Sequence, residues 1–174
     1  MLNALGDRRP VKDDGIGTLL NLRYSVRNSA ASRNIALGSQ ALLLDNKDKS
    51  LKPVRNVMYA SNAFDGDKST RAQAGGQFAW TLGTDLGKLF STISRCKVYF
   101  AKDSYATEFV ILASEDGKSW QQVAKKSDNK SLEVEISFAP KKARYLKLRS
   151  IKPDGPNQEG GQMSVAEFEV FQGK

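Results

Sequence analysis

The residues of this sequence that could hold a metal ion gather in one short segment. Asp65, Gly66 and Asp67 are followed by Thr70, so carboxylate, hydroxyl and carbonyl oxygens stand close together along the chain. The glycine allows the backbone to curl until these oxygens converge. Hard oxygen donors of this kind suit Ca²⁺, although Gly66 comes too early for an EF-hand loop and no Glu stands at its last ligand position. The alternative interpretation is an ordinary solvated turn.

Side chains for nucleophilic or zinc chemistry are nearly absent. The sequence has no histidine and 1 cysteine, Cys96. Catalytic triads that need His, zinc sites built on His or several Cys, and a disulfide within the chain are therefore excluded. Cys96 lies in a strand-like run, which favours a buried, unreactive thiol. Neighbouring carboxylates are expected to face solvent, so we predict that the domain is not an enzyme; these pairs are Glu115 with Asp116 and Glu133 with Glu135.

The chain is basic, but its positive charge is not concentrated. Residues 1–55 carry 10 Lys+Arg and 5 Asp+Glu, and residues 56–174 carry 17 and 14, so the surplus of +8 divides into +5 and +3. Acidic residues separate the short basic runs, and aromatic residues do not interleave with them as stacking platforms would. We therefore expect no nucleic-acid partner.

No segment resembles a membrane span or an export signal. The longest apolar runs fall far short of the roughly 20 residues that a spanning helix needs, so membrane insertion is not expected. The first residues mix acidic and basic groups where a secretory signal has a continuous apolar region. A module taken from a larger secreted protein would look the same, so the compartment stays open. Residues 1–33 are predicted to be a linker or arm, and residues 34–172 the folded domain.

The elements that must position these residues are short strands. Apolar and polar residues alternate at 132–138, which places Leu132 and Val134 on one face. The Asp-Gly pair at 116–117 favours a tight hairpin between strands at 108–114 and 119–125. Further strands are expected at 97–101, 144–151 and 164–172. With almost no long amphipathic helix, this pattern predicts an all-β antiparallel sandwich or jelly roll.

The order of several motifs resembles that of the F5/8 type C, or discoidin-like, galactose-binding family. The motif NAFDGDKSTRA (62–72) is similar to the family's calcium loop. The others follow in family order: NIALGSQA (34–41) as the opening strand, FAWTLGTDLG (78–87) as a strand ending in an Asp-Leu-Gly turn, SEDGKSW (114–120), ARYLKL (143–148) and VAEFEVF (165–171). The resemblance is strongest to family 32 carbohydrate-binding modules attached to bacterial glycoside hydrolases.

This resemblance implies an eight-stranded antiparallel β-sandwich, with a structural calcium ion on its flank and a separate ligand site among loops at one end. The ion would connect the first loop to the last strand. The alternative for Glu167 is an ordinary surface carboxylate. The implied ligands are the carbonyls of Ala63, Asp67 and Ala166, the side chains of Asp65 and Thr70, and the carboxylate of Glu167.

The ligand site is expected in the loops at 44–61, 71–78, 101–107 and 151–162. Sugars pack their CH faces on aromatic rings and need polar side chains for their hydroxyl groups. The predicted platforms are Tyr59 and Tyr105, with Arg71, Gln73, Lys102 and Asn157 as hydroxyl partners. Tyr59 could instead be tucked against the body, and Arg71 could pair with Asp65 or Asp67. Trp80 and Trp120 are assigned to the core.

The chain departs from the family pattern at three places in these loops. Ala72 stands where an aromatic residue often follows the Thr-Arg pair. The loop at 101–107 offers Lys102, Asp103 and Tyr105 in place of an Arg and an Asn. The last loop has Asn157 and Gln158 but no aromatic residue. These departures weaken the sugar assignment.

Two functions follow from the resemblance. The first is a non-catalytic module that brings a parent enzyme or cell-surface protein to galactose-type or amino-sugar glycans. The parent would be multidomain and secreted, placing the module outside the cell, at the cell surface or in the periplasm. The alternative is a discoidin-like adhesion domain for a protein or an anionic lipid surface, with Leu42–Leu44 or Val57 and Met58 as apolar contacts.

Overall fold

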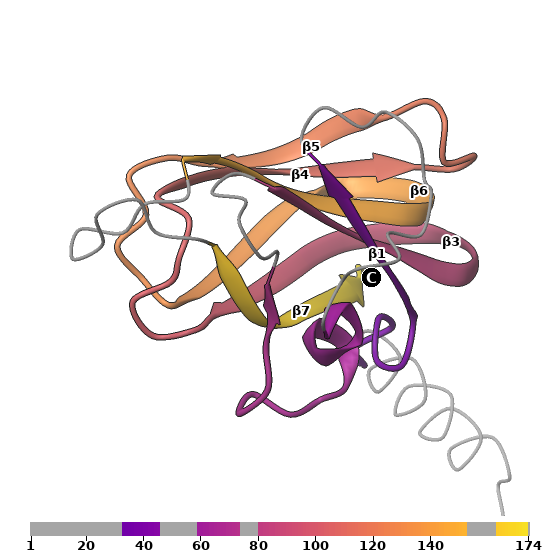
Figure 1. Cartoon of the computed structure of the whole chain (residues 1–174). Helices are drawn as coiled ribbons and strands as arrows, with labels where there is room; N and C mark the ends of the chain where they lie inside the picture. The colour runs from indigo at the N-terminus through magenta and orange to yellow at the C-terminus, as the bar shows by residue number, and fades with distance from the viewer. Residues whose placement is uncertain (1–32, 46–58, 74–79, 153–162, 174) are drawn as a thin grey trace, which may run out of the picture.

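The computed structural model describes residues 33–45, 59–73, 80–152 and 163–173 (Figure 1). These residues form seven strands and one 3₁₀ helix, and every strand pairing is antiparallel. The elements are β1 (Gln40–Asp45), η1 (Ala60–Phe64), β2 (Ala72–Gln73), β3 (Trp80–Phe100), β4 (Glu108–Ser114), β5 (Gln121–Lys126), β6 (Glu133–Lys152) and β7 (Ser164–Gln172). No helix in these ranges is long and apolar enough to cross a membrane.

Two long strands, β3 and β6, belong to both layers of the sandwich. The first part of β3 pairs with β1 on one side and with residues 145–149 of β6 on the other. The same part of β6 pairs with β4, and β4 pairs with β5. The second part, from Arg95, pairs with β7 and with residues 133–137 of β6. Register shifts between Asp85 and Arg95 mark the bend, and Figure 1 shows both strands as curved ribbons. One continuous hydrogen-bonded sheet therefore folds back on itself.

These bent strands explain the strand number. The predicted all-β antiparallel jelly-roll fold is confirmed, and the described residues form seven strands where eight were predicted. The strands expected at 78–87 and 97–101 are continuous in β3, and those expected at 132–138 and 144–151 are continuous in β6. The two-residue strand β2 was not expected. A glycine at the bend, Gly87, has φ 77° and donates its amide to Asp85 Oδ1 at 2.8 Å.

The opening strand starts later than predicted. Residues 35–38 form a turn, and β1 begins at Gln40. Asn34 Oδ1 accepts the amides of Ala36 and Val170, both at 3.0 Å, while the Ile35 amide donates to the Val170 carbonyl at 2.8 Å. Asn34 therefore ties the start of the domain to the last strand.

The core lies between the two layers. Its largest fully buried apolar side chains come from η1, from the strands on both sides and from the residue before β7: Phe64, Trp80, Leu82, Ile93, Phe109, Ile111, Leu146, Leu148, Met163 and Phe168. Phe64 packs on Phe168 with ring centroids 6.1 Å apart, which fixes η1 against β7. The Trp80 indole donates to the Met163 carbonyl at 2.7 Å. The assignment of Trp80 to the core is confirmed.

Cys96 is expected to be unreactive in the native protein. Its side chain is buried in β3, and burial raises the pKa of the thiol because the thiolate would lose its solvation. We expect no reaction with a thiol-specific chromogenic disulfide at pH 8 until guanidinium unfolds the chain, when one thiol per chain should react. Rapid labelling of the folded protein would contradict this.

Candidate functional site

The loop after η1 brings several oxygen atoms together, as the sequence predicted. Gly66 has φ +83°, a conformation that strains any residue with a side chain, and a Cβ at this position would also push against Leu37 Cδ1 at 3.1 Å, so the turn favours glycine. Asp65 Oδ1 accepts the Asp67 amide at 2.8 Å. Thr70 Oγ1 lies 2.8 Å from Asp65 Oδ2 and 3.0 Å from the Asp67 carbonyl oxygen. The loop therefore presents a carboxylate, a hydroxyl and a carbonyl in one place.

The Asp67 side chain has a different role from its carbonyl. Its Oδ1 accepts the Ser69 amide at 2.8 Å and the Ser69 hydroxyl at 2.7 Å. These two hydrogen bonds lower the pKa of Asp67. The carboxylate shapes the turn, while the Asp67 carbonyl accepts a hydrogen bond from the Thr70 hydroxyl.

Glu167 meets this loop from β7, about a hundred residues later in the chain. Its side chain is fully buried, and Oε1 accepts the Gly66 amide at 2.7 Å. Its Oε2 is also buried and has no hydrogen-bond partner. Burial, followed by the nearby Asp65 carboxyl, raises the pKa of Glu167 to about 7. A buried carboxylate oxygen without a partner beside a second carboxylate costs free energy unless a cation compensates it.

These contacts fit the predicted calcium ligands. Asp65, Asp67, Thr70 and Glu167 are brought together, and Ala63 and Ala166 lie buried beside them in η1 and β7. Across the described ranges, no three His, Cys, Asp or Glu side chains form a metal-binding group. The donor set here instead mixes two carboxylates with hydroxyl and carbonyl oxygens, which is the composition that Ca²⁺ accepts.

The predicted ligand loops begin or end at one end of the sandwich, which we call the ligand end. At this end Asp45 pairs with Trp80, Glu108 pairs with Lys152, and Gln73 pairs with Ser164. Ser164 also joins the loop at 101–107, since its carbonyl accepts the Ala101 amide at 3.0 Å and its amide donates to the Ser104 carbonyl at 2.8 Å. The backbone therefore gathers the candidate loops around a fixed base.

Three of the predicted ligand residues lie along one connected edge. The Asn62 amide donates to the Tyr59 carbonyl at 3.0 Å, and Asn62 Nδ2 donates to the Arg71 carbonyl at 3.3 Å. Gln73 follows Arg71 in β2 and lies 3.4 Å from the Ser164 hydroxyl. Tyr59 is 58% exposed and has φ 76°, an uncommon conformation for a bulky residue. The tucked alternative for Tyr59 does not hold.

Asn62 is the positioning residue that the sequence did not single out. It connects the segments of Tyr59 and Arg71 through one backbone and one side-chain hydrogen bond. Its position as the first residue of the loop motif could have indicated this role, because the short amide side chain of Asn can form a hydrogen bond with a nearby backbone group. Lys102 is exposed at the same end, within the loop that Ser164 holds. Asn157 lies outside the described residues.

Three further sequence predictions are corrected. Tyr105 is 7% exposed and belongs to the core, so it presents no platform for a ligand. Trp120 is half-buried and lines a surface pocket, so it is not a core residue. Leu42 is 4% exposed and cannot serve as an apolar spike, while Val57 and Met58 lie outside the described residues.

The carboxylate pairs considered for catalysis are engaged in other contacts. The Glu135 carboxylate forms ion pairs with Lys97 and with Arg95, each at 3.0 Å. These two contacts lower the pKa of Glu135. Glu115 pairs with Lys142 at 3.0 Å. These carboxylates therefore form surface ion pairs with lysine and arginine side chains.

The described residues thus form an antiparallel jelly roll with loops gathered at one end and an oxygen-rich loop on its flank. The family model described as NedA-like, galactose-binding domain, of the F5/8 type C group, matches residues 62–148. The chain belongs to this family. No curated protein matches the chain.

Solved structures of carbohydrate-binding modules and lectin domains share the fold. Chitosan-binding module 2 of a chitosanase/glucanase from Paenibacillus sp. IK-5, in complex with chitotriose, is 24% identical, with TM-score 0.61 over 79% of this chain and 99% of that one. The lectin domain of lectinolysin, complexed with Lewis B antigen, is 25% identical, with TM-score 0.60 over 82% and 99%. The family 32 carbohydrate-binding module of Streptococcus pneumoniae EndoD is 14% identical, with TM-score 0.64 over 81% and 100%. These neighbours are binding modules, in line with a domain that is not an enzyme.

Proposed function

We propose that this domain is a non-catalytic carbohydrate-binding module that binds glycans at the ligand end. The observation that carries the proposal is the edge formed by Tyr59, Arg71 and Gln73, where an exposed aromatic ring and polar side chains are held on a rigid base. An aromatic surface beside hydrogen-bonding groups is the chemistry that sugars need. The chitotriose and Lewis B complexes of the structural neighbours support the same class of ligand.

We further propose the biological setting of the module. It brings a secreted, multidomain parent, either a glycan-active enzyme or a cell-surface protein, to galactose-type or amino-sugar glycans. It therefore acts outside the cell, at the cell surface or in the periplasm. The affinity for one site of this shallow kind falls in roughly the micromolar to millimolar range.

A calcium ion at the loop after η1 completes the proposal. The residues that would hold it are Asp65, Thr70 and Glu167 through their side chains and Ala63, Asp67 and Ala166 through their carbonyls. When bound, the ion supplies positive charge that compensates the buried Glu167 carboxylate. Its role is structural, because it joins the loop to β7 and leaves the polar edge at the ligand end to contact the sugar.

Glycan binding is expected to depend on Tyr59. Loss of the ring in Tyr59→Ala should weaken binding of the best glycan by about threefold to tenfold, as expected for one sugar–aromatic contact. The measurement is a glycan array on the calcium-loaded protein, followed by calorimetric titration of the best glycan. Leu89→Ala is a matched control, because Leu89 is 45% exposed and lies in the bend of β3.

A blank array from folded protein would contradict the glycan proposal. The discoidin-like alternative, an adhesion domain for a protein or an anionic lipid surface, would then be tested by pelleting the protein with vesicles containing phosphatidylserine. Binding to these vesicles, lost at high salt, would favour a lipid surface.

A further inference from the structure

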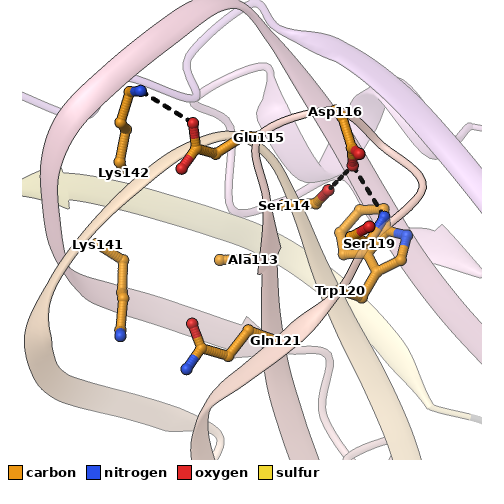
Figure 2. Close-up of a pocket in the computed structure, with 9 residues that line it drawn as sticks. All are labelled: Ala113, Ser114, Glu115, Asp116, Ser119, Trp120, Gln121, Lys141 and Lys142. Carbon is orange, nitrogen blue, oxygen red and sulfur yellow. Dashed lines mark hydrogen bonds and ion pairs between the residues drawn. The ribbon is translucent and has the colours of Figure 1, made fainter.

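A surface pocket lies at the end of the sandwich opposite the ligand end. It has a volume of about 560 Å³ and is formed by the turn between β4 and β5 together with the bend of β6 (Figure 2). The strand β4 runs from the ligand end at Glu108 to this pocket at Ser114, a distance of about 20 Å for a strand of this length. We call this surface pocket the turn pocket. A ligand in the turn pocket would not touch the loops at the ligand end.

One wall of the turn pocket is a fixed aromatic ring. The Trp120 indole donates to the Gly117 carbonyl at 3.2 Å, and Lys147 Nζ lies 3.8 Å from the ring centroid. Lys147 is 7% exposed and does not line the pocket, so it supports the ring from the protein side. The ring is therefore held in place before any ligand arrives, which reduces the entropic cost of binding.

The turn that carries Trp120 is rigid as well. Asp116 Oδ1 accepts the amides of Lys118 and Ser119, both at 2.8 Å, and lies 3.0 Å from the Ser114 hydroxyl. These bonds to backbone amides lower the pKa of Asp116 to about 2. The carboxylate is thus committed to the turn, where the two amide dipoles stabilise its negative charge.

The remaining polar groups of the pocket include a lysine that pairs with none of the described residues. Glu115 and Lys142 neutralise each other across 3.0 Å at the rim. Gln121 offers an amide that can both donate and accept. Lys141 lies on the side of the pocket away from Trp120 in Figure 2 and forms no ion pair with any described residue. Among the residues that the structure describes, Lys141 is the lining cation without an ion pair; together with an aromatic wall and paired donors and acceptors it suits a polar ring that carries a negative charge.

We propose that the turn pocket is a second saccharide-binding site, and that it takes a sugar residue bearing a carboxylate. The sugar ring packs on Trp120, its carboxylate pairs with Lys141, and its hydroxyl groups bond to Gln121 and to the Glu115–Lys142 pair. This class comprises uronic acids and related acidic sugars. A module with saccharide sites at both ends would link two glycan chains, which raises its avidity for a polymer.

Titration with trigalacturonate, followed by NMR on the ¹⁵N-labelled full chain, tests this proposal. The sequence has 2 tryptophans, so the indole signals report the two ends separately. Trp120 lines the turn pocket, and Trp80 donates to the Met163 carbonyl at the ligand end. The Trp120 signal, assigned with Trp120→Phe, is expected to shift in a saturable way at millimolar ligand, and the fully methyl-esterified trisaccharide should bind more weakly.

A pair of charge-matched variants separates a specific contact from general attraction. Lys141→Gln should weaken trigalacturonate binding at the Trp120 signal by about threefold to fivefold, the range of one exposed ion pair. Lys118→Gln removes the same charge from an exposed residue of the same turn that does not line the pocket, and should leave the affinity unchanged. An unmoved Trp120 signal, or equal losses in both variants, would overturn the proposal. A response of Trp80 alone would support the ligand end and refute the turn pocket.

Discussion

Calcium is expected to raise the melting temperature of the wild-type protein by about 5 to 10 °C. The melting temperature of the Glu167→Gln variant is expected to be the same with and without calcium. A ligand present at a hundred times its dissociation constant stabilises the native state by about 2.7 kcal/mol. For a domain of this size, each kcal/mol shifts the melting temperature by roughly 2 to 4 °C. Glu167 carries the buried oxygen without a partner, so removing its charge removes the main reason for the ion to bind. Differential scanning calorimetry in EDTA and in excess calcium gives the comparison.

The control for this prediction is Glu169→Gln, two residues along β7. This variant loses one carboxylate from the same strand, but Glu167 still accepts the Gly66 amide of the calcium loop and Asp65 is unchanged. Its melting temperature should still rise with calcium. Equal responses in wild type and Glu167→Gln would show that calcium acts elsewhere, and no response in wild type would remove the calcium proposal.

The strands whose side chains alternate were the most predictable part of this fold. The pairing of β4 with β5 was predicted from the Asp-Gly pair at 116–117, and Gly117 has φ 73°. The tight two-residue turn was wrong, because residues 115–120 separate the two strands and Asp116 is not in the positive-φ region. The last strand was predicted at 164–172, the bounds of β7. Both predictions rest on local chemistry, namely alternation at period two and a glycine that tolerates positive φ. Neither needs knowledge of the rest of the chain.

The bends in β3 and β6 were less predictable, because they depend on pairing between distant residues. The Asp-Leu-Gly motif at 85–87 predicts the end of a strand. The chain instead pairs with β6 both before and after this motif. A turn motif reports only that the backbone changes direction. Whether the strand continues in the same sheet is decided by its partners, which lie about fifty residues away.

The aromatic side chains of the candidate sites show the same limit of local reasoning. Tyr105 and Tyr59 both stand near loops, yet one is 7% exposed and the other 58%. Tyr105 is covered because the base of its loop is bonded to Ser164, which draws the segment onto the core. Trp120 immediately precedes β5 and lies against Lys147 at the turn pocket. Exposure of a ring depends on which layer covers it, and the sequence does not contain that information locally.

The calcium loop lies between these cases. The donor types and the glycine were readable from residues 65–70, but the pairing with Glu167 came from a family resemblance. The structure supplies the physical link, since Glu167 Oε1 accepts the Gly66 amide while Oε2 has no partner. A carboxylate in a predicted strand gives no sign by itself that it is buried.

Metal-free protein is expected to lose stability as the pH rises from 5 to 8. The pKa of Glu167 is about 7 in the folded protein, against an ordinary value of 4.5. Between these values the native state holds a proton that the unfolded state has released, so the free energy of unfolding falls with increasing pH. At 1.36 kcal/mol per pKa unit, the loss approaches about 3 kcal/mol above pH 7. Urea denaturation in EDTA across this range measures it.

Two comparisons make this pH dependence specific to Glu167. The neutral side chain of Glu167→Gln can accept the Gly66 amide and donate to the Asp65 carboxylate. We therefore expect a much flatter pH profile and, at pH 8, a metal-free protein more stable than wild type. In excess calcium the wild-type slope should largely disappear, because the bound cation keeps Glu167 ionised in the native state, and the side chain is then deprotonated in both states over most of this range. A wild-type profile in EDTA that rises from pH 5 to 8 would show that Glu167 is already ionised in the folded chain without a cation.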